Sequence, residues 1–139
     1  MIPVSKWKWF GNAGHFIGAR DCRFHLCTQV DKFLISTVGE YFPTYELRKN
    51  DIELNKFEKE NPWGKKIGCD RIFETMVFEA GKPCDRPSCH CRLPEISGSD
   101  LDFNGYNDRK AATEGHMEMC LKYATINQTQ FLQQSKKEY

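Results

Sequence analysis

Long apolar runs are missing from the 139-residue sequence. None approaches the roughly 20 residues that a membrane-spanning helix needs, so we expect no membrane contact. The first ten residues, Met1–Phe10, also lack the apolar core and the small-residue cleavage site of a signal peptide. Both absences predict a cytoplasmic protein.

Net charge is scarce as well. The formal charge at pH 7 is +1, so attraction of the whole molecule to nucleic acid or to anionic lipid is weak, and such binding would need a local patch. There is no internal repeat. Length and a hydrophobic fraction of 40% predict one domain spanning residues 1–139, large enough to bury a core.

Alternating apolar and polar residues predict the strands. Period-two patterns occur at residues 6–10, with both tryptophans on one face, and at Cys22–Val30, Phe33–Phe42 and Ile67–Ala80. The two residues between the second and third strands predict a hairpin. His15–Ile17 is a further, returning strand candidate.

One helix is predicted near the C-terminus. Asn107 or Asp108 can cap it, and a stripe at spacings of three and four follows, made of Ala112, His116, Met119, Cys120 and Tyr123. The predicted fold class is α+β, an antiparallel sheet of four to five strands with one main C-terminal helix and a zinc-pinned cysteine-rich loop.

Two segments are expected to be poorly anchored. Residues 43–66 are a charged insertion with few apolar anchors, and a short helix there has little support. Residues 125–139 form a polar, weakly ordered tail. Residues 94–100, with a proline and a Ser-Gly-Ser-Asp run, indicate irregular structure.

Cysteine and histidine gather between residues 84 and 120. Seven cysteines in a reducing compartment favour metal ligands or free thiols over disulfides. Zinc prefers thiolate and imidazole donors in tetrahedral sets drawn from two chain segments. We predict a structural zinc held by a loop and by one face of the helix; the set is Cys84, Cys91, His116 and Cys120, with Cys89 competing with Cys91.

A second metal pattern overlaps the first. Asp100, Asp102 and Asn104 match the start of a calcium loop that precedes a helix. Position twelve is Ala111 and supplies no bidentate carboxylate, so the alternative interpretation is that these acids cap turns and the helix.

A third cluster could be catalytic. His25 and Cys27 share one strand face, and a thiolate–imidazole pair with His15 nearby would suit a hydrolase, or the same residues could hold a second metal. A nucleophile of this kind needs a lowered thiol pKa and a pocket. A half-buried histidine beside packed thiols is the alternative.

Cations and aromatics alternate at the N-terminus. Lys6, Trp7, Lys8 and Trp9 could stack bases and hold phosphates. The alternative is two core tryptophans with lysines that extend to solvent between them.

Four stretches carry a family resemblance. Ser5–Gly11, Cys22–Thr28, Ser36–Tyr41 and Leu93–Ser97 together resemble a family of uncharacterised small proteins of tailed phages. The resemblance implies no activity and no catalytic residue. It implies a partner in the host cell and, for a phage protein, a location in the host cytoplasm.

These observations predict a small zinc-stabilised binding protein that acts on a host protein, or on nucleic acid through the N-terminal lysines and tryptophans. The alternatives are a hydrolase that uses the His15, His25 and Cys27 cluster, and a structural or virion-associated protein.

Overall fold

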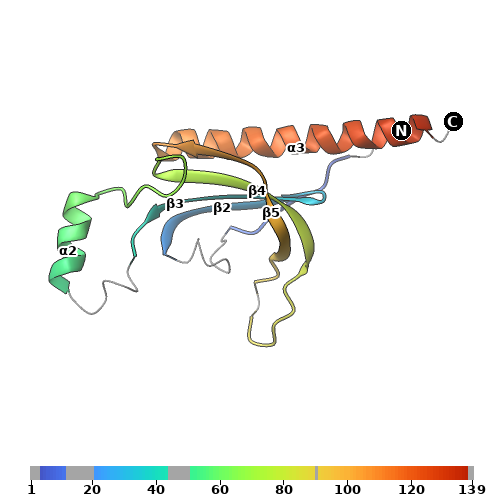
Figure 1. Cartoon of the computed structure of the whole chain (residues 1–139). Helices are drawn as coiled ribbons and strands as arrows, with labels where there is room; N and C mark the ends of the chain where they lie inside the picture. The colour runs from blue at the N-terminus through green and yellow to red at the C-terminus, as the bar shows by residue number, and fades with distance from the viewer. Residues whose placement is uncertain (1–3, 12–20, 44–50, 90, 138–139) are drawn as a thin grey trace.

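The computed structural model describes residues 4–11, 21–43, 51–89 and 91–137. The order of elements is five strands interrupted by a helix and followed by a second helix. The strands form one antiparallel sheet in the order β1-β2-β3-β4-β5, so each strand pairs with its neighbours in sequence. The predicted α+β class, with one sheet and a main C-terminal helix, is confirmed (Figure 1).

The first hairpin is formed as predicted. β2 (Cys22–Val30) and β3 (Phe33–Tyr41) pair with Val30 opposite Phe33, which leaves a two-residue turn. Asp31 adopts a φ of 54° in this turn, a conformation that aspartate tolerates better than most residues.

β1 (Trp7–Trp9) is a short edge strand on β2. The Asp31 carboxylate anchors it, accepting hydrogen bonds from the Ser5 hydroxyl and from the Lys6 backbone N–H, both at 2.8 Å. Trp7 and Trp9 pair with Val30 and Thr28, so they share one face of the sheet, as the alternation predicted. The predicted strand at His15–Ile17 lies outside the described residues.

The second hairpin differs from the prediction. β4 (Phe73–Pro83) begins later than expected, and β5 (Pro94–Tyr106) occupies the segment predicted to be irregular. The pairing shifts register between Val77 and Glu79, where Gly98 has a φ of +79°. The turn-forming residues therefore bend a long edge strand instead of ending it, because pairing with β4 outweighs their local preference.

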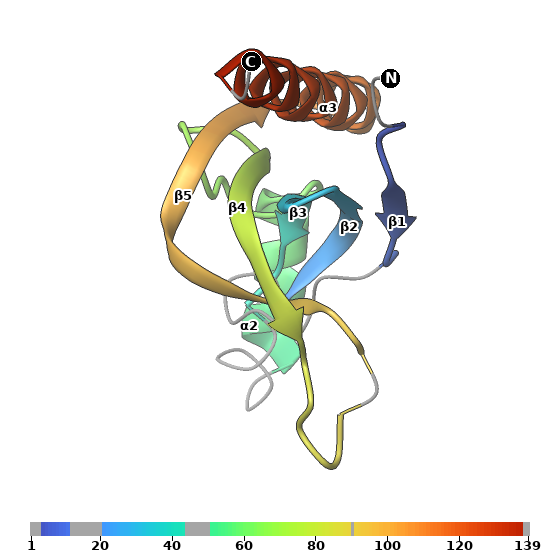
Figure 2. The same ribbon diagram turned by 90° about the vertical axis from the view of Figure 1, so that its right-hand side faces the viewer.

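α3 (Arg109–Lys137) lies across one face of the sheet (Figures 1 and 2). The Asp108 carboxylate caps it by accepting a hydrogen bond from the Ala111 backbone N–H at 2.7 Å. The predicted stripe is confirmed, since its members are all buried: Ala112, His116, Met119, Cys120 and Tyr123. The helix also runs through most of the segment that was predicted to be a weakly ordered tail.

The charged insertion contains a real helix, α2 (Asp51–Glu60), at one end of the sheet (Figure 1). Phe57 makes an edge contact with Phe42, with ring centroids 6.0 Å apart, and Glu58 pairs with Arg23 at 3.0 Å. These tertiary contacts explain a helix whose own sequence has little amphipathic pattern.

Two apolar clusters cover the two faces of the sheet. The first joins α3 to the sheet and includes Val30, Phe33, Ile35, Val77 and Tyr123. The second, on the other face, consists of Cys27, Leu34 and Leu93, with Phe10, Val38, Ala80 and Cys91 packed against it. None of the described helices is long and apolar enough to cross a membrane.

A partly buried ion pair ties α3 to the end of β3. The Arg109 guanidinium binds the Glu40 carboxylate through two nitrogens, one of them at 2.6 Å. The Glu40 side chain is 5% exposed and the Arg109 side chain 60% exposed. Removing the arginine would therefore leave a buried carboxylate unpaired.

We expect Arg109→Ala to lower the free energy of unfolding measurably, because the Glu40 carboxylate loses its partner. Lys110→Ala is the matched control, since Lys110 is exposed and its pair with Glu114 spans 4.0 Å; the loss there should be under about 0.5 kcal/mol. Urea unfolding measures both. Equal losses in the two variants would contradict a special role for the Glu40 pair.

Candidate metal centre

The loop between β4 and β5 gathers three cysteines. Pro83 pairs with Pro94 at the end of the ladder, and the Cys84 N–H donates to the Leu93 carbonyl at 2.7 Å. Within the loop the Cys89 N–H donates to the Arg86 carbonyl at 3.0 Å, which closes a turn with Pro87 at its second position. This turn folds the chain back and brings Cys89 toward Cys84.

The ligand atoms of Cys84, Cys89 and Cys91 all lie within 4.8 Å of one another. The three thiols are unoxidised and partly buried. Burial and hydrogen bonds from its neighbours' sulfurs act to raise the pKa of the Cys91 thiol, and a backbone hydrogen bond at Leu93 opposes them; the net direction is upward. In the described part of the chain no other group of three or more His, Cys, Asp or Glu side chains has this convergence.

The prediction that the helix completes this site is wrong. α3 and the cysteine loop lie at opposite sides of the sheet (Figures 1 and 2), and neither His116 nor Cys120 belongs to the converging group. Their spacing of four does put both residues on one helix face, but that face is buried in the core. The structure therefore keeps three of the five predicted ligands together and separates the other two.

His116 is instead the centre of a buried polar network. Its Nε2 lies 2.8 Å from the Thr28 hydroxyl and its Nδ1 lies 2.7 Å from the Thr37 hydroxyl. Thr37 also contacts the Thr75 hydroxyl at 2.5 Å. Both ring nitrogens are thus occupied by hydrogen bonds, and burial lowers the pKa of His116 to about 4. A neutral imidazole that links α3 to the sheet is a structural element and has no nitrogen available for a metal.

The thiols in the core are inert. Cys27 and Cys120 have no exposed surface. Burial raises the pKa of the Cys27 thiol to about 12 and that of Cys120 to about 11, the latter against a hydrogen bond from Thr28. Because the thiolate is the nucleophile, these groups lack the reactive form at neutral pH.

The predicted catalytic cluster has no reactive nucleophile, because its thiol is that of Cys27. Cys27 packs with Leu34 and Leu93, and His25 lies 2.7 Å from the Cys22 carbonyl through its Nε2. His15 lies outside the described residues. The expectation of an activated thiolate beside His25 is wrong, because Cys27 faces a closed apolar cluster and no solvent.

The calcium interpretation is also wrong. Asp100, Asp102 and Asn104 lie in β5, an extended strand that cannot wrap an ion. The Asp102 carboxylate accepts hydrogen bonds from Lys122 at 2.7 Å and from the Tyr123 hydroxyl at 3.2 Å. It ties β5 to α3.

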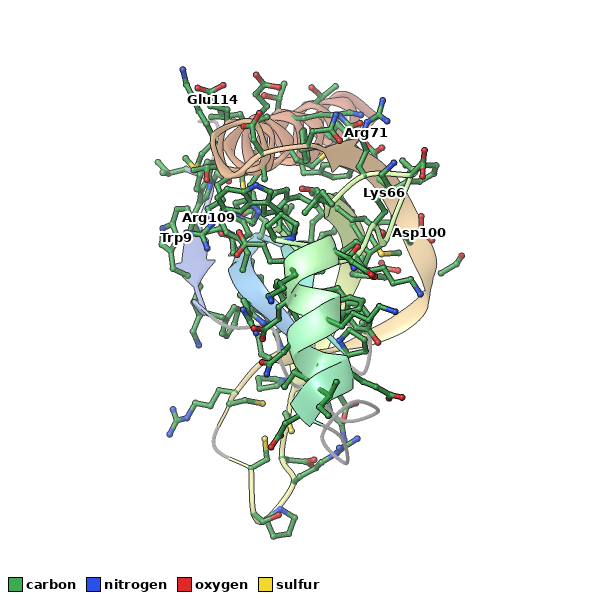
Figure 3. The ribbon with its side chains drawn as sticks, turned by 90° about the vertical axis from the view of Figure 1, so that its left-hand side faces the viewer. Trp9, Lys66, Arg71, Asp100, Arg109 and Glu114 are labelled. Atoms are coloured by element: carbon green, nitrogen blue, oxygen red, sulfur yellow. The ribbon has the colours of Figure 1, made fainter. Side chains whose placement is uncertain are left out.

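The N-terminal lysines and tryptophans divide between core and surface. Trp7 packs against the core cluster under α3, whereas Trp9 is 54% exposed and its ring centroid lies 6.0 Å from that of His116. Trp9 and Arg109 appear on the same side in Figure 3. Lys6 and Lys8 are exposed, and Trp9 is the tryptophan of this pair with ring surface free to stack.

Comparisons with protein-family models, with curated proteins and with solved structures give no match for this chain.

The threonine partners of His116 were not predicted from the sequence. Thr28, Thr37 and Thr75 each lie in a predicted strand, where threonine is an ordinary residue. The sequence contains part of the information. Thr28 shares a strand face with the apolar Val30, so it is expected to point into the core, where its hydroxyl needs a polar partner. Which partner it takes depends on the packing of α3.

Proposed function

We propose that this protein binds one zinc ion through Cys84, Cys89 and Cys91, and that the ion orders the β4–β5 loop as a binding element for a host protein. The observation that carries the proposal is the convergence of three sulfurs within 4.8 Å. Zinc–sulfur bonds of about 2.3 Å in a tetrahedron place sulfurs a little under 4 Å apart. The loop needs only a small contraction to reach that spacing.

The donor set suits a soft or borderline ion. Thiolates select zinc and copper(I) over magnesium or calcium. Because thiols must lose protons to bind, and because the pKa of Cys91 is raised, zinc binding should release protons and weaken as the pH falls.

The ion would stabilise more than the loop itself. Cys91 packs against the cluster of Cys27, Leu34 and Leu93, and Cys84 is hydrogen-bonded to Leu93. An ion that joins these two cysteines therefore fixes the loop to the second core cluster. Its binding energy would appear as folding energy, but the ion would join the loop to this cluster and not, as the sequence predicted, to the helix.

Zinc content of the purified protein tests the metal site. We expect about one zinc per chain in the wild type and almost none after combined Cys84→Ser, Cys89→Ser and Cys91→Ser substitution. The melting temperature of the variant should fall by several degrees, and chelation should lower that of the wild type similarly.

Two variants separate this site from other thiols. Cys69→Ser changes an exposed cysteine and Cys120→Ser a buried one, and both should retain zinc. His90→Ala, at a position outside the described residues, tests whether the fourth donor comes from the chain. Wild-type protein with well under one zinc per chain and a melting curve unaffected by chelators would refute the zinc proposal.

Inorganic arsenite tests the geometry independently of zinc. One As(OH)3 condenses with three converging thiols to give As(SR)3 and releases three water molecules. Native mass spectrometry should show this adduct in metal-free wild type and in Cys69→Ser, and no such adduct in Cys89→Ser. An unchanged adduct in Cys89→Ser would show that the three sulfurs do not act as a set.

The proposed partner rests on charge and on the family resemblance. Arg86 and Arg92 are exposed on the loop, where a metal-fixed backbone would hold them at low entropic cost. A small phage protein with such a loop would act in the host cytoplasm by binding host machinery. Nucleic acid is the second candidate partner, favoured by the exposed ring of Trp9 next to the exposed Lys8.

A further inference from the structure

Trp63 is the most exposed tryptophan among the described residues, at 61%. It lies in a turn in which the Gly64 N–H donates to the Asn61 carbonyl at 3.0 Å, with Pro62 at the second position. Asn61 continues the end of α2, because both its backbone N–H and its side-chain nitrogen donate to the Phe57 carbonyl, at 2.8 and 3.1 Å. The tryptophan therefore follows α2 without a flexible link.

The turn is fixed to the sheet as well. Gly64 has a φ of +85°, and a Cβ there would meet the Glu40 and Tyr41 backbone at 2.7 Å. The next residue, Lys65, donates its N–H to the Tyr41 carbonyl at 2.8 Å. A large aromatic side chain is thus held in solvent on an anchored backbone, so little conformational entropy remains to be lost when it binds.

A hollow of about 380 Å³ adjoins this turn, with an apolar floor that includes Pro62, Trp63 and Ile72. A second hollow of about 510 Å³ runs along α2 past Ile52, which is 80% exposed, and the two share Glu60. Figure 3 shows α2 facing the viewer with Lys66 beyond one end of it. We call the two hollows together the Trp63 surface.

The charges around the Trp63 surface do not balance. Glu60 is paired with Lys56 at 4.0 Å, and Lys66 with Asp70 at 3.6 Å. Lys59 and Lys65 are in no ion pair with another described residue. Within the described part of the chain, the rim therefore offers two ammonium groups without an acidic partner beside apolar lining residues.

We propose that the Trp63 surface binds an acidic segment of a partner protein that packs an apolar side chain against Trp63. Tryptophan is enriched among the residues that dominate binding at interfaces, and the lysines complement an acidic flank. A nucleic-acid strand would need a longer row of cations along its backbone, whereas a short acidic flank needs only the lysines that line the two hollows. The inference rests on the binding role proposed above and not on the zinc ion.

Selection from a random peptide library displayed on phage, against the immobilised full chain, tests this surface. Selected peptides should combine acidic residues with an aromatic or aliphatic residue. Synthesised with a fluorescent label, they should bind Trp63→Ser and Lys65→Glu at least about tenfold more weakly than the wild type. Trp9→Ser, which removes the other exposed tryptophan, should bind as the wild type does, and circular dichroism checks that each variant is folded.

Several results would overturn the inference. Peptides whose affinity depends on Arg86 or Arg92 and not on Trp63 would move the protein-binding role to the β4–β5 loop and leave that role intact. Trp63-dependent binding of a labelled oligothymidylate, with no acidic peptide selected, would make the ligand a nucleic acid. Failure to select any peptide would count against this surface, while zinc analysis decides the metal site separately.

Discussion

Replacing His116 with alanine should lower the free energy of unfolding by about 3–5 kcal/mol, a large effect for a single side chain. His116 is fully buried. Its removal leaves a cavity between α3 and the sheet and removes the imidazole hydrogen bonds of the Thr28 and Thr37 hydroxyls, at 2.8 and 2.7 Å. Thr37 keeps its contact with Thr75, whereas a lost hydrogen bond at a buried hydroxyl costs about 1–3 kcal/mol.

Glu114→Ala is the control for this variant, because Glu114 lies on the exposed side of the same helix (Figure 3). Urea unfolding should show little change for it. Zinc content should be unchanged in both variants. Loss of zinc from His116→Ala would return this residue to the metal site and contradict the separation of helix and cysteine loop.

Acidification from pH 7 to pH 4 should remove up to about 3 kcal/mol of stability through His116 alone. Burial lowers the pKa of this imidazole from 6.5 to about 4 in the folded protein. Between these values the unfolded chain binds a proton that the folded protein does not bind. The contribution of His116 to the free energy of unfolding is therefore fully present above pH 6.5 and is lost as the pH falls toward 4.

The other groups with shifted pKa values contribute outside this window or with the opposite sign. The core thiols of Cys27 and Cys120, with pKa values of about 12 and 11, stay neutral. Burial acts to raise the pKa of Asp102, but hydrogen bonds and the charge of Lys122 outweigh it and lower that pKa, so its contribution is lost only below about pH 4. Burial and Asp100 raise the pKa of Glu74, which acts with the opposite sign.

Comparison of wild type with His116→Gln isolates the histidine. Urea unfolding from pH 7 to pH 4 should show a steeper loss for the wild type, and the difference between the two proteins cancels the carboxylates. The imidazole carbon-bound proton resonances of His116 should also remain those of the neutral ring down to about pH 5. Protonation of His116 near pH 6.5 in the folded protein would refute the argument.

Periodicity and composition were enough to predict much of the fold. Alternation placed β2 and β3, the two-residue spacing between them predicted their hairpin, and both tryptophans of β1 share a face as expected. The stripe through Ala112 and Tyr123 predicted the buried face of α3, and Asp108 its cap. These features depend on local geometry, which repeats every two residues in a strand and every 3.6 in a helix.

Tertiary contacts decided the rest. β5 exists because β4 supplies a partner for a segment whose glycine and serines favour turns, and α2 is held by contacts with Phe42 and Arg23. The five predicted metal ligands divide for a similar reason. Cys84, Cys89 and Cys91 converge through a local turn that the sequence encodes. His116 and Cys120 are four residues apart and therefore share one face of α3. That face packs onto Thr28 and Thr37, away from the three cysteines. A stripe shows which side of a helix is buried, but only the packed structure shows which surface buries it.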